Sequence, residues 1–172
     1  DGTFGNGGYT RAILGKGANV IGIDRDSTAI ANGPAMVDEQ QGRFKLVHGA
    51  FSGLDEHARS VGFDEVDGVV LDIGVSSMQL DQAERGFSFR FDGPLDMRMA
   101  MDGPSAADVV NALDVRQLHR VIAALGEEKK AGSVARAIVA ARAEEQITRT
   151  SQLTSIVEKA VGVRANDKIH PA

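Results

Sequence analysis

The first eight residues, DGTFGNGG, contain four glycines and begin with an aspartate, Asp1. Glycine tolerates positive φ and lets a ligand approach the main chain closely, so such a run is typical of the turn between a strand and the next helix. The pattern is D-x-T-x-G-x-G, with Thr10 where a dinucleotide-type G-x-G-x-x-G motif requires glycine. The acid at its head favours a site for S-adenosylmethionine (SAM) over one for NAD. A plain surface turn is the alternative interpretation.

Two more aspartates follow short apolar runs. Asp24 ends the run VIGI and lies 19 positions after Gly5, where a carboxylate can accept both ribose hydroxyls of a nucleoside. Asp72 ends the run VVL and is expected at the same crevice. A helix cap is the alternative role for Asp72. Together with the glycine turn, the two carboxylates predict a nucleoside-binding site.

Aromatic side chains provide candidate stacking surfaces. Phe51 follows His48-Gly49 and is placed to pack against an adenine ring, although a lone phenylalanine is more often part of a core. A second group combines aromatic and basic residues, as single-stranded nucleic-acid sites do; here the alternative is a β-hairpin that buries three phenylalanines on one face. This group consists of Arg85, Phe87, Phe89, Arg90, Phe91 and Arg98.

Other site chemistries find little support. Ser76 or Ser77 with His48 and Asp24 would resemble a hydrolase triad, but there is no G-x-S-x-G elbow. The four histidines show no metal-ligand spacing, and there is no cysteine to supply a thiolate ligand or nucleophile. We therefore predict no metal site.

The elements that must position these residues alternate between strand and helix in the first half. Strands are predicted at 20–23, 44–47 and 69–71, and helices at 10–16, 27–32 and 54–61. Strands that are apolar on both faces indicate a parallel sheet covered on both sides. In such sheets ligands bind beyond the carboxyl ends of the strands, where the glycine turn and both aspartates fall.

From Ser105 onward, apolar residues recur at helical spacing, which predicts a helical domain or an insertion into the sheet. Helix ends are expected at Gly126 and Gly162. Residues predicted to start helices are Asp108, Asp114, Ser133 and Thr150 or Ser151.

The composition is that of a globular chain: 172 residues, 42% hydrophobic, with a net charge of -5. Residues 1–100 carry 9 basic against 15 acidic side chains, and residues 101–172 carry 10 against 9. Any contact with nucleic acid must therefore come from local patches. No apolar run is long enough to cross a bilayer and no signal pattern is visible, so we expect a cytoplasmic protein without a membrane partner.

Several motifs, in order, carry a family resemblance: DGTFGNGGYTRAIL, GIDRD, HGAF, DIGVSS, LDQAERGFSFRFDGPLDMRM, GEE, ARAIV, ITRT and HPA. With them the chain resembles the RsmH (MraW) family of small-subunit ribosomal RNA cytosine-N4 methyltransferases over nearly its whole length. The resemblance implies an α/β, class I SAM-dependent methyltransferase fold, Rossmann-like with a mostly parallel sheet and an inserted all-helical domain. We expect a partial methyltransferase core at 1–102, the insertion at 103–168 and a return to the core at 169–172, in a chain truncated at both ends.

The resemblance also implies site residues and a reaction. The methyl group of SAM would be transferred to the N4 amine of a cytosine in 16S ribosomal RNA. The substrate would be either the free RNA or the assembled small ribosomal subunit. Asp72 is the best candidate for a catalytic contact, and no general base is identified. The RNA candidates are Arg85, Phe87, Phe89, Arg90 and Arg98; the implied SAM contacts are Gly7, Gly8, Tyr9, Asp24, Phe51, Asp72 and Gln79.

Two functions of other classes stay open. One is an NAD-dependent oxidoreductase, which Thr10 disfavours because it replaces the third glycine of the dinucleotide motif. The other is an RNA-binding module without catalysis. Binding of SAM without NAD would exclude the first, and methyl transfer would exclude the second.

Overall fold

The structure is a computed structural model, and it describes residues 1–162. These residues form two compact units. The first consists of Asp1–Ser76 with Met99–Asp102, and the second consists of Ser77–Arg98 with the described residues from Gly103 onward. The sequence predicts a boundary after residue 102, whereas residues 77–98 make their contacts with the helical unit. The predicted return to the core at 169–172 lies outside the described residues.

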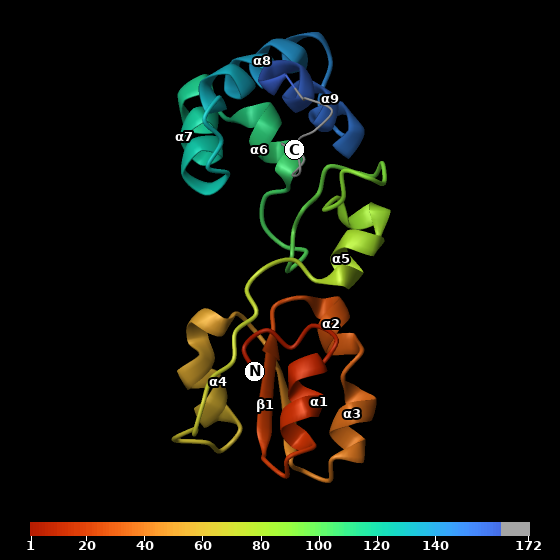
Figure 1. Cartoon of the computed structure of the whole chain (residues 1–172), viewed down its shortest axis with the longest axis vertical. Coiled ribbons are helices and arrows are strands. Elements are labelled where there is room, and N and C mark those ends of the chain that lie inside the picture. The colour runs from red at the N-terminus through yellow and green to blue at the C-terminus, as the bar shows by residue number, and fades with distance from the viewer. Residues whose placement is uncertain (163–172) are drawn as a thin grey trace. The chain divides into compact units, whose positions relative to one another are not determined.

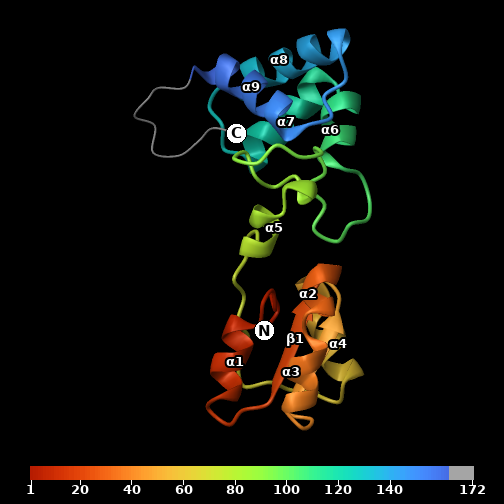
Figure 2. The same cartoon turned by 90° about the vertical axis from the view of Figure 1, so that its right-hand side faces the viewer.

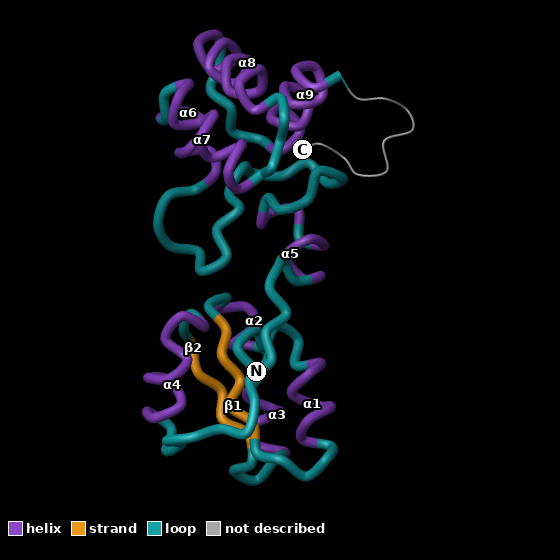
Figure 3. The backbone as a smooth tube through the Cα atoms, turned by 60° about the vertical axis from the view of Figure 1, so that its left-hand side comes forward, coloured by secondary structure: helices purple, strands orange, loops and turns teal. Residues whose placement is uncertain are grey.

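The first unit is built on two parallel strands, as the apolar runs predict. Strand β1 (Val20–Asp24) pairs with β2 (Phe44–His48), and the register aligns Asp24 with His48. Figure 3 shows the two strands side by side, with their connecting helices around them. The carboxyl ends of both strands therefore meet at the same edge, which is the edge that carries Asp24.

Short helices surround these strands. Figures 1 and 3 both show α4 on the opposite side of the strands from α1. The sequence does not predict α3, which begins at a proline after Gly33; proline is favoured at the first position of a helix. The elements of this unit are α1 (Gly8–Leu14), α2 (Ser27–Ala31), α3 (Pro34–Glu39), the 3-10 turn η1 (Phe51–Gly53) and α4 (Leu54–Ser60).

The predicted third strand at 69–71 is not formed among the described residues. Residues 1–4 lie next to β1: Ile23 donates a backbone hydrogen bond to the Asp1 carbonyl, and Phe4 donates one to the Ile23 carbonyl. On their other side, Gly2 donates to the Val70 carbonyl at 2.9 Å. One such backbone bond does not make a ladder, so the run 69–71 lies at the edge of the unit without strand structure.

The second unit is helical. Its larger helices, α6 to α9, gather into one cluster in Figure 2. Their buried side chains form a core with Leu95, which comes from the preceding loop. The periodicity of the sequence is thus confirmed as a helical pattern. The elements are α5 (Ser77–Asp81), the 3-10 turn η2 (Ala83–Arg85), α6 (Ala106–Ala112), α7 (Val115–Leu125), α8 (Ala131–Glu144) and α9 (Thr150–Val161).

Capping side chains fix where these helices begin. Asp114 is the N-cap of α7, as predicted, and accepts a hydrogen bond from the Gln117 amide at 2.8 Å. For α6 the N-cap is Ser105, and Asp108 is its partner in the capping box three residues later. Ser133 does not start a helix, because α8 already begins at Ala131. The predicted ends at Gly126 and Gly162 and the start of α9 at Thr150 are confirmed.

Candidate cofactor site

The glycine-rich loop turns sharply into α1. Gly5 and Gly7 adopt positive φ values of 52° and 74°, and the Gly7 amide donates a hydrogen bond to the Phe4 carbonyl at 2.7 Å. A Cβ atom at Gly7 would lie 2.7 Å from Met36 Cε, so only glycine satisfies both the conformation and the space. At Gly8, by contrast, a Cβ atom would meet nothing within 4 Å. The loop therefore closes tightly on its inner side and leaves its main chain open at Gly8.

Asp24 ties this loop to the end of β1. Its Oδ2 accepts the Gly5 amide at 2.7 Å, and its Oδ1 accepts the Asp26 amide at 2.9 Å. Each carboxylate oxygen has two lone pairs, so one acceptor position remains on each oxygen for a ligand. The Asp24 carbonyl also accepts the Gly49 amide, which joins the loop after β2 to the same edge. The predicted grouping of Asp24 with the glycine turn is thus present in the fold.

Asp72 reaches the same loop through its main chain. Its amide donates to Thr3 Oγ1 at 2.8 Å, and its side chain is exposed. Phe51 is half-buried and lies beside Gly2, because a Cβ atom at Gly2 would be 3.2 Å from Phe51 Cβ. Residues 1–8 are therefore in contact with the segments that carry Asp24, Phe51 and Asp72.

Tyr9 and Gln79 differ in their surroundings. Tyr9, in the first turn of α1, is 50% exposed, and its ring is available to a ligand. Gln79 belongs to α5 in the second unit, where it is 4% exposed.

The aromatic and basic segment of the second unit is not a hairpin, because residues 87–91 form no strand. Phe89 is 46% exposed, and the Arg90 guanidinium lies 6.0 Å from the centre of its ring. Phe87 is half-buried beneath Arg85, whose guanidinium lies 5.9 Å from the ring centre. Phe89 and Arg90 therefore present an aromatic face and a cation to solvent.

Two of the candidate arginines have internal partners. Arg85 is 6% exposed and donates to the Arg98 carbonyl at 3.1 Å. Arg98 forms an ion pair with Asp96, with 2.6 Å between Nη2 and Oδ2. The hydrogen bond from Arg98 holds the pKa of the Asp96 carboxyl below its ordinary value. Both arginines therefore organise the loop, and Arg90 remains the candidate best exposed for a phosphate.

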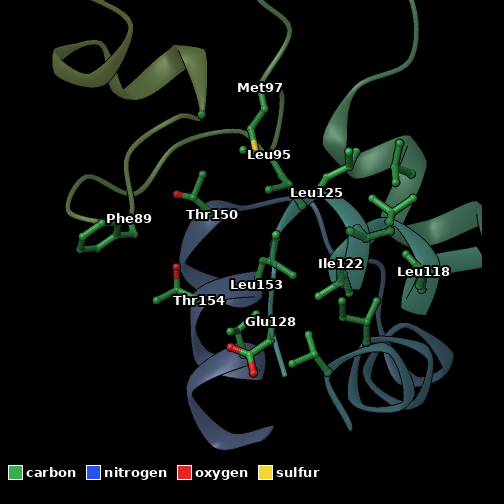
Figure 4. Close-up of a pocket in the computed structure, with 18 of the residues that line it drawn as sticks. Phe89, Leu95, Met97, Leu118, Ile122, Leu125, Glu128, Thr150, Leu153 and Thr154 are labelled. Atoms are coloured by element: carbon green, nitrogen blue, oxygen red, sulfur yellow. The ribbon is translucent and has the colours of Figure 1, made fainter. Parts of the chain in front are cut away.

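A cavity of about 470 Å³ lies within the helical unit, between this loop and helices α7 to α9. Figure 4 shows its lining, which is mostly apolar, with Thr154 and Glu128 among the polar side chains. Phe89 and Met97 line it from the loop, and Leu125 lines it from α7. Phe89 is thus both a part of the cavity wall and a part of the exposed surface.

Acidification should destabilise the helical unit. The pKa values of Asp92, Asp96, Asp108 and Asp114 are all held below the ordinary value, by hydrogen bonds from Ser151, Arg98, Ser105 and Gln117 respectively. A carboxyl with a lowered pKa in the folded state adds stability above its unfolded value, and this stability is lost as the pH falls through the folded value. The free energy of unfolding should therefore drop below about pH 4.

Urea unfolding between pH 7 and pH 2.5 measures this dependence. An Asp96→Asn variant should show a weaker loss on acidification than the parent, whereas Glu144→Gln, at an exposed carboxylate of α8, should follow the parent. An unchanged pH profile for Asp96→Asn would contradict this role of the ion pair with Arg98.

The structure adds two functional candidates, Thr3 and Thr10, that the sequence motifs do not predict. Thr3 and Thr10 belong to the motif region, but their partners are set by the fold: Thr10 donates to Asp1 Oδ2 at 2.7 Å, and Thr3 accepts from Asp72. The sequence motif D-x-T-x-G includes Thr3, but it does not predict that Thr3 accepts a hydrogen bond from the Asp72 amide. Among residues 1–162, no group of three or more acidic or histidine side chains is placed to hold a metal ion.

Comparison with known proteins assigns a family. The model of the MraW methylase family matches residues 1–172. Over its full length, the chain is 63% identical to a protein of Azorhizobium caulinodans and 58% identical to proteins of Parvibaculum lavamentivorans and Agrobacterium fabrum. Each of these is named "Ribosomal RNA small subunit methyltransferase H". The chain spans about half the length of these curated relatives.

Proposed function

The chain belongs to the MraW methylase family, and we propose that the protein that contains it is a SAM-dependent methyltransferase acting on ribosomal RNA of the small subunit. The name that these relatives share supports the substrate. From the family resemblance we further propose 16S ribosomal RNA as the substrate, the exocyclic N4 amine of a cytosine as the acceptor, and the cytoplasm as the location. Among residues 1–162, no helix is long and apolar enough to cross a membrane.

The observation that carries the proposal is the hydrogen bond between the glycine loop and Asp24, at 2.7 Å from the Gly5 nitrogen to Oδ2. It brings together the accessible main chain at Gly8 and the Asp24 carboxylate, whose oxygens can each accept one more hydrogen bond. Both lie at the edge where the two parallel strands end. This is the arrangement that nucleoside-containing cofactors use in α/β folds.

The residues present fit SAM. We assign the Asp24 carboxylate to the two ribose hydroxyls and the partly exposed Phe51 to the adenine. The amides of Gly8 and Tyr9 lie in the first turn of α1, where they have no acceptor within the helix, so they suit the carboxylate of the methionine part. Gly8 leaves room for that approach.

For the fold we propose a class I methyltransferase sheet with an insertion at residues 103–168, whose described part contains helices α6 to α9. The order of neighbours supports this: the segment that contains Val70 bonds to residues 1–4, residues 1–4 bond to β1, and β1 pairs with β2. Two segments of this order, β1 and the segment with Val70, end at Asp24 and Asp72, the carboxylates that the sequence predicts beside the cofactor.

When bound, SAM supplies a methyl group on a positively charged sulfur. A nitrogen nucleophile can attack the methyl carbon, and the sulfur then leaves as a neutral thioether. The N4 amine of cytosine is a weak nucleophile because its lone pair is conjugated with the ring, so alignment matters most. The exposed Asp72 carboxylate is our candidate to accept a hydrogen bond from that amine. Phe89 and Arg90 are our candidates for stacking on a base and neutralising a phosphate.

The test is methyl transfer from labelled SAM by the purified full-length protein. Small ribosomal subunits from cells that lack the protein should accept label on the N4 atom of a cytosine, as identified by digestion to nucleosides. SAM should bind in calorimetry and NAD should not. Label on another atom, or none on subunits or free RNA, would contradict the proposal.

Two variants separate the RNA side from the cofactor side. Phe89→Ala and Arg90→Ala should each raise the KM for subunits by about tenfold, the size expected for one lost stacking contact or one lost hydrogen bond to a charged group. Both should leave the dissociation constant of SAM unchanged. Arg120→Ala, at an exposed arginine of α7, is the matched control and should behave like the parent. An unchanged KM in both variants would remove this segment from the proposed RNA surface.

A further inference from the structure

The segment that carries Asp72 is attached to the glycine loop through a side chain. Gly2 donates to the Val70 carbonyl, and two residues later the Asp72 amide donates to Thr3 Oγ1 at 2.8 Å. The second bond spans 69 positions of sequence. It joins the two parts of the candidate site that precede and follow the strands.

Packing among the described residues does little to fix this segment. Leu71 and Ile73, the neighbours of Asp72, are 41% and 70% exposed. A stretch with so much exposed surface and no strand ladder is held mainly by its individual hydrogen bonds. The bond to Thr3 therefore has a large share in setting where Asp72 lies.

Thr3 is itself firmly held. Its amide donates to Asp1 Oδ1 at 3.2 Å, and Asp1 Oδ2 accepts the Thr10 hydroxyl at 2.7 Å. Thr10 is completely buried on α1. The Thr3 hydroxyl thus stands at the end of a series of hydrogen bonds that begins inside the unit, and it can transmit a fixed position to Asp72.

We propose that Thr3 is a positioning residue: its hydroxyl holds the main chain of Asp72 so that the Asp72 carboxylate faces the same ligand as the glycine loop and Asp24. The inference rests on the proposed function, because it assigns Asp72 to the cofactor and the acceptor amine. Thr3 touches neither reacting group; it acts through Asp72.

The test removes the hydroxyl and keeps the shape. In the full-length protein, Thr3→Val should raise the dissociation constant of SAM by about fivefold to tenfold, as expected for one lost hydrogen bond, and should lower kcat. Thr3→Ser keeps the hydroxyl and should bind SAM within about twofold of the parent. If Thr3→Val does not fold, the comparison of Thr3→Ser with Thr3→Ala isolates the hydroxyl in the same way.

A double-mutant cycle decides whether Thr3 acts through Asp72. Asp72→Ala alone should weaken binding and turnover, and adding Thr3→Val to it should cause little further loss. A purely structural role would instead give additive losses and would overturn the inference. If the parent binds SAM and Thr3→Val binds it with the same dissociation constant, the inference is also overturned. A parent that binds no SAM would overturn the proposed function and this inference together.

Discussion

Replacing Asp24 with alanine should weaken SAM binding by about 100-fold or more. Two ribose hydroxyls would each lose an ionised acceptor, and hydrogen bonds to charged groups contribute about 1.5 to 3 kcal/mol each. The substitution also removes the acceptors of the Gly5 and Asp26 amides, which lie 2.7 and 2.9 Å from the carboxylate oxygens. The glycine loop would then lose its anchor at the end of β1. Calorimetric titration of the full-length protein with SAM measures the change.

Two controls make this result specific. Asp38→Ala removes an exposed carboxylate from α3 of the same unit and should bind SAM like the parent. Asp24→Asn keeps one side-chain oxygen and should fall between the parent and the alanine variant. Binding by Asp24→Ala within twofold of the parent would show that the ribose lies elsewhere.

Replacing Gly93 with alanine should destabilise the helical unit by about 3 kcal/mol, because overpacking and lost hydrogen bonds add. A Cβ atom at Gly93 would overlap the carbonyl group of Ala83, which is main chain and cannot rotate away. Gly93 also exchanges two hydrogen bonds with the buried Thr150: its amide donates to Oγ1 at 3.1 Å, and its carbonyl accepts the Thr150 amide at 3.0 Å. Displacing either segment would strain both bonds.

Gly132→Ala is the matched control within the same unit. Gly132 lies inside α8, and its nearest neighbour would be Arg136 Nη1 at 3.5 Å, an ordinary contact. Alanine should be neutral there or stabilise the helix by up to about 1 kcal/mol. Urea unfolding of the two variants tests the pair, and an equal stability of both would refute the steric argument at Gly93.

The sequence predicts the elements whose pattern is local. Strands β1 and β2 follow from short, mostly apolar runs, and α7 follows from Asp114 as a cap with helical spacing after it. The run 69–71 is just as apolar, yet it forms no strand in the described part. Among the residues that the structure describes, one backbone hydrogen bond, from the Gly2 amide to the Val70 carbonyl, joins this run to its neighbour, and a ladder needs a series of such bonds.

The site is predictable in part for the same reason. Asp24 could be grouped with the glycine loop because both follow from a known spacing, and the fold brings them within 2.7 Å. The role of Thr3 could not be predicted, because its partner lies 69 residues away. Arg85 and Arg98 look alike in a sequence pattern, and only the fold reveals that they bond within the loop.

Asp92 has a consequence for the order of folding. Its carboxylate receives Arg149 Nε at 2.6 Å and the Ser151 amide at 3.2 Å, so it satisfies the start of α9 from 57 and 59 positions upstream. A helix whose first turn donates to so distant a residue gains that stabilisation only after a long loop has closed. We therefore expect the first turn of α9 to become protected from hydrogen exchange together with the loop around Asp92, and later than the interior of α8.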